Sequence, residues 1–208
     1  MTAKEFWKEF ELYEEGIRFY LDMAKKEEKN HESYRYLCAQ LEQYCEGLEP
    51  TLAGRSKENV GKYTITISCN GNKNLFLHVN RLVGEAPNIP NWQINAFIEP
   101  KKNIGMEEIM DSPFTFEDFS ITPKDILFTV IAWDPDKNIF DILLLLPLNL
   151  AGVDDNKLEE AFMIIIQEIW GERFVADRIN TLSFISHITS EYDFYELEML
   201  QECLESFE

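Results

Sequence analysis

Apolar side chains recur every three or four residues along the first 50 positions, and this spacing predicts two helices. The stripe of the first helix consists of Phe6, Phe10, Tyr13, Ile17, Tyr20 and Ala24. Thr2, followed three residues later by Glu5, forms a capping box at its start. The stripe of the second helix consists of Tyr34, Leu37, Cys38, Leu41, Tyr44 and Leu48. We expect an antiparallel helical hairpin that must bury its apolar face against later elements.

The pattern changes to strict alternation after a polar linker at residues 55–61. Apolar and hydroxyl side chains alternate over residues 63–69, which predicts a strand with one wet face. A helix is predicted from about Lys73 until Pro87 ends it, and a second strand over residues 92–98.

The clearest local signal in the second half is a β-hairpin. Two apolar segments, residues 126–133 and 138–146, flank the turn residues Asp134-Pro135-Asp136-Lys137. The run from Ile142 to Leu146 has no polar alternate, so we expect this strand to be central in its sheet and covered on both faces. Before the hairpin, the pattern predicts a long connection (99–113), a short strand near Phe114 and a single helical turn after Thr122.

The remaining elements are a helix, two strands and a final helix. The helix begins near Asn156 and is apolar almost all round until Gly171 stops it. Strands are predicted over residues 174–179 and 182–188, and an amphipathic helix over residues 194–204.

Together these elements predict the order α-α-β-α-β-β-β-β-α-β-β-α. Consecutive strands with short turns favour an α+β fold, with a mostly antiparallel sheet, helices packed on its faces and the helical hairpin in front. No composition break divides the chain. We therefore expect a single domain over residues 1–208, with residues 1–50 as a helical appendage and residues 60–208 as the sheet-and-helix body.

Charge is the unusual feature of the composition. The 208 residues include 38 acidic and 19 basic side chains, a net charge of −19, while 45% of residues are hydrophobic. A surface this negative disfavours nucleic acid and anionic membranes, and it favours encounter with a basic protein. Acidity that serves solubility alone is the open alternative.

The same sequence argues for a cytoplasmic location. The chain starts without the basic and apolar layout of a signal peptide, and no apolar run approaches the length of a membrane span. The four cysteines form no C-x-x-C pair, which fits free thiols in a reducing compartment.

Several short segments carry a family resemblance. The first half of the chain resembles an uncharacterised bacterial protein family. The segments that carry the resemblance are the opening Phe6-Trp7-Lys8-Glu9-Phe10, residues 67–71, Glu85-Ala86-Pro87, Trp92 and residues 96–100. The resemblance implies a bacterial cytoplasmic protein without an assigned activity. Cys69 stands where the family would have a small or acidic residue, which argues against a shared reactive loop at residues 68–71.

The candidates for metal or phosphate chemistry have simpler interpretations. Asp134 to Asn138 resembles the start of a calcium loop, but Ile139 and Leu145 replace the glycine and glutamate that such a loop needs, so we expect a turn. The three histidines form no helical metal pair, and Cys69 near His78 is interpreted as a packed thiol beside an exposed ring. Residues 70–73 have no phosphate-binding fingerprint and are interpreted as a turn and helix cap.

The candidates for catalysis are equally weak. The neighbouring carboxylates Glu117-Asp118 and Asp154-Asp155 could act as acid and base only if they were buried opposite one another, and we expect capping or solvated groups instead. No G-x-S-x-G elbow is present. The sequence therefore identifies no catalytic residue, leaves open whether the chain is an enzyme, and predicts no metal and no cofactor.

The acidic C-terminal segment is the best candidate for a binding site. Residues 189–208 contain seven carboxylates and no Lys or Arg. The expected partner-binding residues are Glu191, Asp193, Glu196, Glu198, Glu202 and Glu205. Glu198, Glu202 and Glu205 would share one helical face, opposite Leu197, Leu200 and Leu204. A merely solvated outer face is the alternative.

These observations favour a non-catalytic protein-interaction domain with a basic partner, for example an immunity-type protein that blocks a basic toxin or nuclease. The first alternative is a small enzyme whose carboxylates or histidines, such as Asp118 or His78, converge only in the fold. The second is the scaffold subunit of a homo-oligomer, which would show a large apolar surface patch.

Overall fold

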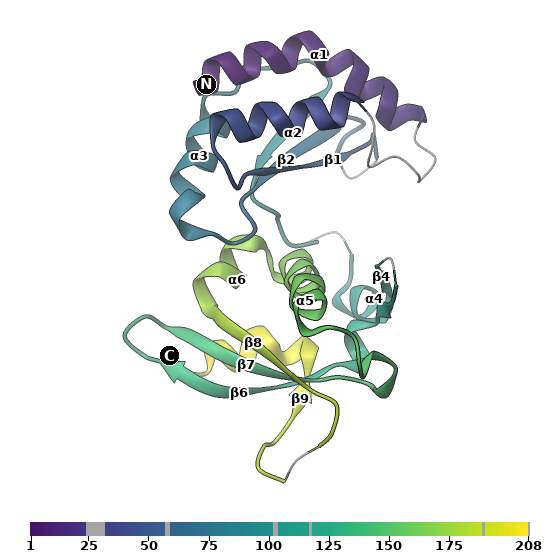
Figure 1. The fold of residues 1–208 in the computed structure, drawn as a ribbon, viewed down its shortest axis with the longest axis vertical. Helices are drawn as coiled ribbons and strands as arrows, with labels where there is room; N and C mark the ends of the chain where they lie inside the picture. Colours follow the sequence, from purple (N-terminus) through teal and green to yellow (C-terminus); the bar gives the residue numbers. More distant parts are fainter. Residues whose placement is uncertain (24–31, 57–58, 102–103, 117, 189, 208) are drawn as a thin grey trace. The chain divides into compact units, whose positions relative to one another are not determined.

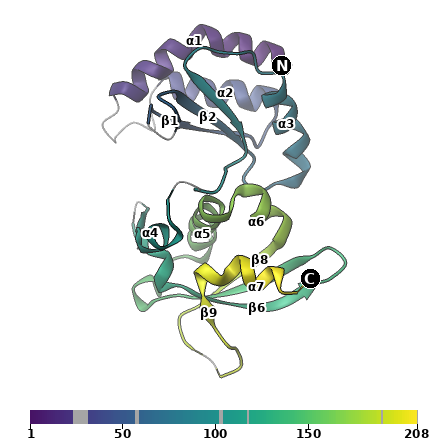
Figure 2. The same cartoon turned by 180° about the vertical axis from the view of Figure 1, so that it is seen from behind.

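The chain forms two compact units, residues 1–98 (unit 1) and residues 99–208 (unit 2), in a computed structural model (Figures 1 and 2). The structure describes residues 1–23, 32–56, 59–101, 104–116, 118–188 and 190–207. Both units combine helices with sheets, so the α+β class is confirmed. The boundary differs from the expected body over residues 60–208, because the helical hairpin packs on the first three strands and forms a core with them.

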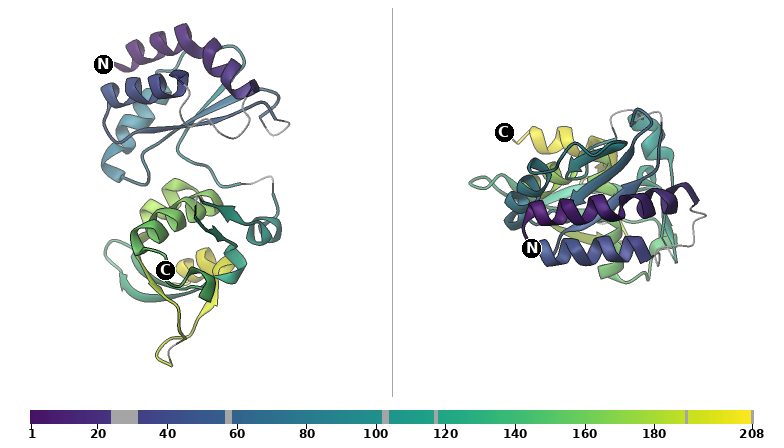
Figure 3. Two further views of the ribbon diagram at one scale, coloured as in Figure 1. Left: turned by 45° about the vertical axis from the view of Figure 1, so that its right-hand side comes forward. Right: turned by 90° about the horizontal axis from the view of Figure 1, so that it is seen from above.

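Two long helices open unit 1. Helix α1 (Ala3–Met23) and helix α2 (Glu32–Tyr44) lie side by side, as the right-hand view of Figure 3 shows. The expected capping box is confirmed, since the backbone N–H of Thr2 donates to Glu5 Oε2 at 2.7 Å and that of Glu5 donates to Thr2 Oγ1 at 3.3 Å.

The sheet of unit 1 has three strands in the order β1-β2-β3: Glu49–Ala53, Tyr63–Ser68 and Trp92–Ala96. Strands β1 and β2 are antiparallel, but β2 and β3 are parallel because η1 (Lys73–Leu75) and helix α3 (Phe76–Gly84) connect them as a crossover. Among the described strands, four of the six pairs are antiparallel, so the expectation of mostly antiparallel pairing is confirmed, and the two parallel pairs make the larger sheets mixed. Strand β1 was absent from the predicted elements.

One face of this sheet carries the whole core of unit 1. Tyr63, Ile65 and Ile67 point toward the helices and are completely buried. The Trp7 indole N–H of α1 donates to the carbonyl of Leu82 at 2.7 Å, which joins α1 to α3. The opposite face carries only small or polar side chains, namely Glu49, Thr51, Ala53, Thr64, Thr66, Ser68, Gln93 and Asn95. The predicted polar face of β2 is confirmed, with Thr64 and Thr66 half-buried and Ser68 buried.

Unit 2 begins with short elements that lead into a four-stranded sheet. They are α4 (Met106–Asp111), β4 (Phe114–Thr115), β5 (Ser120–Ile121) and the helical turn η2 (Pro123–Asp125). Ile109 and Met110 pin α4 to the core. The sheet has the order β8-β7-β6-β9, with β6 at Leu127–Asp134, β7 at Ile139–Leu145, β8 at Ile179–Ile185 and β9 at Tyr195–Glu196.

The predicted hairpin is confirmed, because β6 and β7 are antiparallel neighbours with a bulge between Val130 and Ala132. Strand β7 is central, as expected, and it pairs in parallel with β8. Its side chains at Leu143 and Leu145 are 7% and 9% exposed. Both are therefore buried, as expected for a strand covered on both faces, although neither belongs to the core cluster beneath the helices.

The helices of unit 2 all contribute to one core. Helix α5 (Asp155–Trp170) follows the turn η3 (Leu148–Leu150), and α6 (Glu172–Arg178) follows α5 directly. The last elements are η4 (Leu197–Met199) and α7 (Leu200–Glu205). Side chains of α5, α6 and α7 pack with Phe128, Ile142 and Leu144 of the sheet in a single cluster. Figures 1 and 2 show these helices along one side of the sheet.

Two predicted elements of unit 2 are wrong in kind or length. Residues 172–178 are helical, where a strand over 174–179 was predicted. Gly171 ends α5 as expected, but its backbone (φ 89°, ψ 147°) turns the chain into a second helix, a conformation open mainly to glycine. The predicted helix over residues 194–204 is shortened, since β9 and η4 take up its first half.

Two further findings concern the whole described chain. None of its described helices is both long enough and apolar enough to cross a bilayer. The four cysteines all lie among the described residues and form no disulfide; Cys69 is buried and the other three are half-buried.

A carboxylate on α1 ties that helix to the sheet of unit 1. Glu14 accepts hydrogen bonds from the guanidinium of Arg18, at 2.9 Å for Nη2, and from the indole of Trp92 at 2.8 Å. Burial alone would raise the pKa of Glu14, but these hydrogen bonds and the charge of Arg18 hold it below its ordinary value.

We expect Glu14→Gln to lower the free energy of unfolding at pH 7 by about 1 kcal/mol, because the charge-assisted hydrogen bonds are lost in a partly solvated site. A carboxylate with a lowered pKa stabilises the fold above its unfolded pKa, and this contribution is lost as the pH falls through the folded value. The deficit of the variant should therefore be smaller at about pH 3 than at pH 7. Urea unfolding at both pH values measures it, with the exposed Glu11→Gln as control; an equal deficit at both would contradict this account.

Candidate protein-binding surface

The C-terminal segment of unit 2 is an acidic strip fixed on an apolar base. Leu197, Leu200 and Leu204 are at most 1% exposed and belong to the core of unit 2. Farther along, the Phe207 ring lies edge-on to Trp133 and Phe140, at 5.3 Å from each. Each of the three buried leucines contributes about 2 kcal/mol of apolar burial, so the strip is held in place despite its charge.

All six predicted partner-binding carboxylates are exposed. Figure 2 shows the segments that carry them. They are Glu191, Asp193, Glu196, Glu198, Glu202 and Glu205. None of the six forms an ion pair with another described residue. The Gln201 side-chain amide donates to Glu205 Oε1 at 2.7 Å, which leaves the charge of that carboxylate uncompensated.

The strip spans four kinds of structure and is not the single helical face that the spacing suggested. Glu191 and Asp193 lie between β8 and β9, Glu196 lies in β9, and Glu198 lies in the turn η4. Only Glu202 and Glu205 lie in α7. Strand β9 pairs with β6 so that Glu196 is opposite Leu127, which places this carboxylate at the margin of the sheet.

The turn between β6 and β7 has the chemistry that its sequence predicts. Asp134 Oδ1 accepts from the backbone N–H groups of Asp136 and Lys137, at 3.1 and 3.2 Å. The Lys137 side chain and the backbone bonds lower the pKa of Asp134. The carboxylate thus closes a turn.

The connection from β2 to α3 is a turn and cap, as predicted. Asn70 and Gly71 have φ values of 50° and 77°, and the Asn72 side chain accepts from the N–H of Asn74 at 3.1 Å. The Cys69 thiol donates to the carbonyl of Asn72 at 3.5 Å. Sequence reasoning missed the left-handed backbone of Phe97 (φ 66°) just after β3, where an aromatic residue is a rare occupant.

The described metal and acid–base candidates are exposed or have local structural roles. His78 is exposed, with its ring 6.4 Å from that of Tyr44. Asp118 is exposed and pairs with Lys157 at 2.7 Å, which lowers its pKa, opposite to the change that a general acid needs. Asp154 caps α5 by accepting from the N–H groups of residues 156 and 157. Over the residues with assigned positions, no group of three His, Cys, Asp or Glu side chains could hold a metal ion.

Two of these predictions fall outside the described residues, namely those for His31 and Glu117. The third histidine, His187, lies 2.9 Å from the Ser186 hydroxyl through its Nδ1 atom.

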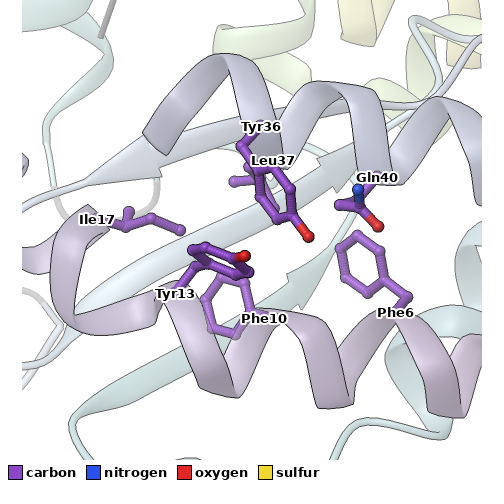
Figure 4. A pocket seen from close by; sticks show the side chains of 7 residues that line it. All are labelled: Phe6, Phe10, Tyr13, Ile17, Tyr36, Leu37 and Gln40. Atoms are coloured by element: carbon purple, nitrogen blue, oxygen red, sulfur yellow. The ribbon is translucent and has the colours of Figure 1, made fainter. Parts of the chain in front are cut away.

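Two hollows of unit 1 are lined by apolar side chains, tyrosines and a few polar groups. The crevice between α1 and α2 in Figure 4 has about 10 Å³ of space, room for one water at most, and its lining is Phe6, Phe10, Tyr13, Ile17, Tyr36, Leu37 and Gln40. A wider hollow of about 500 Å³ is lined by Tyr20, Leu21, Tyr34, Pro50, Thr51 and Leu52. Burial raises the pKa of Tyr34 to about 12, and its hydroxyl donates to the Pro50 carbonyl. No carboxylate or imidazole lines either hollow.

Comparison of the chain with protein-family models, with curated proteins and with solved structures finds no match.

Like charges on the strip should destabilise α7 slightly. Glu202 lies four residues after Glu198 and three before Glu205, and such pairs cost a few tenths of a kcal/mol. We expect Glu202→Gln to raise the free energy of unfolding by roughly that amount in low salt, and the gain to disappear in about 1 M salt. Thermal unfolding measures both, with the exposed Glu46→Gln in unit 1 as control. A gain that persists unchanged in high salt would show that charge repulsion is not its cause.

Proposed function

We propose that the chain is a non-catalytic protein-interaction domain whose acidic C-terminal strip binds a basic partner protein. The observation that carries the proposal is the combination of six exposed carboxylates and buried leucine anchors in a segment without a single Lys or Arg. Complementary charge accelerates encounter with a basic protein and repels nucleic acid.

The anchoring distinguishes this strip from an acidic tail that serves solubility. A tail needs no fixed conformation, whereas here three leucines and Phe207 hold the backbone of the strip against the core. Carboxylates held in fixed positions can match the spacing of Lys and Arg on a partner, and they lose less entropy on binding. One concrete version is an immunity-type protein that binds and blocks a basic toxin or nuclease.

The test is capture of the basic partner by the purified chain at increasing ionic strength. We expect capture to fade as salt rises toward about 0.5 M, because screening then shortens the reach of surface charge to a few Å. Replacing Glu196, Glu198, Glu202 and Glu205 by Gln should reduce it at low salt, measured as bound partner per mole of chain.

The matched control removes four charges from exposed positions of unit 1, with Glu11, Glu15, Glu42 and Glu46 replaced by Gln. Both variants have the same net charge, so an equal loss of capture in both would assign binding to net charge and contradict a role for the strip. Capture that is indifferent to salt would contradict the proposal as a whole.

A further inference from the structure

The sheet of unit 2 has a face that lies outside the core of that unit. Side chains alternate along paired strands, and Phe128, Ile142 and Leu144 point into the core beneath α5 and α7. The alternate positions form the opposite surface, which we call the outer face. Its apolar members are Leu127, Ile131, Ile139, Leu143, Leu145 and Ile185, and none of them packs against the core cluster of the unit.

This outer face is apolar where a solvated face would be polar. The row Leu127, Leu145 and Ile185 runs across three neighbouring strands through their pairing register. Ile131, at the bulge of β6, is 39% exposed. Leu143 and Leu145 of this face are 7% and 9% exposed, so its open apolar area lies at Ile131 and at the half-buried Leu127, Ile139 and Ile185. Exposed apolar area of this kind on a folded unit marks an interaction site.

Unit 1 provides an internal comparison within the same chain. Its sheet also has helices on one face, and every outer position there is polar or small, as in the row Thr51, Thr66 and Asn95. Strict polar alternation is thus what this chain uses where a sheet faces water. Unit 2 departs from that pattern over three strands at once.

The charges of the outer face are all negative. Its ionisable positions are Asp134, Asp141 and Glu196, and no Lys, Arg or His occupies an outer position of β6, β7, β8 or β9. Asp141 lies on the central strand and accepts hydrogen bonds from Asn180 and Thr181 at 2.7 and 2.8 Å, which fixes its carboxylate in place. Glu196 joins this face to the acidic strip.

We propose that the outer face docks a partner protein through an apolar patch flanked by Lys or Arg side chains. The proposal rests on the proposed function, since it assigns the apolar contact of the same complex whose acidic contact is the C-terminal strip. Charge decides the occupant. A second copy of this chain would bring Asp141 and Glu196 against like charges, whereas a cationic rim would pair with them.

The test uses a short synthetic amphipathic helix with a leucine stripe and lysines elsewhere. It is titrated into the isotope-labelled full chain and followed by amide chemical shifts. We expect the shifts to cluster on β6, β7 and β8 around Leu127, Leu143 and Ile185. Replacing the leucines of the probe by serine, or its lysines by glutamate, should weaken binding about tenfold or more, because each removes one half of the recognition.

The matched variants are Ile131→Lys on the outer face and Ile164→Lys on α5, whose isoleucines are 39% and 43% exposed. We expect the first to weaken the probe about tenfold and the second to leave its affinity within about twofold. Ser183→Lys, from the same face on β8, repeats the test should Ile131→Lys unfold, as thermal unfolding would show.

The outcomes separate the two proposals. In one outcome the probe shifts amides only within residues 196–205 and binds Ile131→Lys as tightly as the original chain. This result would overturn the docking role of the outer face and leave the role of the acidic strip intact. Absence of binding by the lysine probe would overturn both. Sedimentation would also reveal whether the chain forms a dimer. A dimer that Ile131→Lys converts to monomers would show that a second copy, and not a basic partner, occupies the outer face.

Discussion

The apolar side chains on both faces of β7 are the constraint that shapes unit 2. A strand paired on both sides must send successive side chains to opposite faces of the sheet. In β7, Ile142 and Leu144 point to the helices, so Leu143 and Leu145 necessarily point away from them. Helices α5, α6 and α7 can cover only the first set. The second set is buried as well, since Leu143 and Leu145 are 7% and 9% exposed, while Ile131 on β6 is 39% exposed. A single uninterrupted apolar run thus places buried apolar side chains on both faces of the sheet.

Unit 1 meets the same geometric constraint with a different sequence. Strand β2 alternates Tyr63, Ile65 and Ile67 with Thr64, Thr66 and Ser68, so one face is buried and the other carries hydroxyl groups. The helical hairpin closes the buried face, with Trp7 bonded to α3 and Glu14 bonded to β3 through Trp92. This explains why residues 1–50 belong to the first unit: their apolar stripe and the buried face of β2 form one core.

Local signals in the sequence predicted those features that depend on neighbouring residues. The capping box at Thr2, the turn at Asp134 and the hairpin β6–β7 need only short-range contacts, and all are confirmed. Features set by distant contacts were not predictable in this way. Strand β1 contains Pro50 and pairs only at a sheet edge, so its pattern is weak. Phe174 and Val175 favour strand by composition, but Gly171 redirects the chain so that Val175 packs into the core as part of a helix. The parallel pairs β2–β3 and β7–β8 follow from crossover connections that no local pattern specifies.

The candidate surface likewise has one part that local sequence signals reveal and another part that they do not reveal. Its carboxylates were evident from the sequence because a segment without Lys or Arg needs no fold to be recognised. The apolar row of the outer face was not predicted from the sequence. The run Ile142 to Leu146 fits a strand that is buried between two helical layers just as well. The two halves have different physical roles. Surface charge mainly sets the rate of encounter and the choice of partner, whereas apolar contact from which water is excluded sets how long a complex lasts. A surface with carboxylates alone would bind many basic proteins briefly. The fold of unit 2 places Glu196 and Asp141 beside a row of leucine and isoleucine side chains. This combination allows the surface to hold one basic protein for longer than the others.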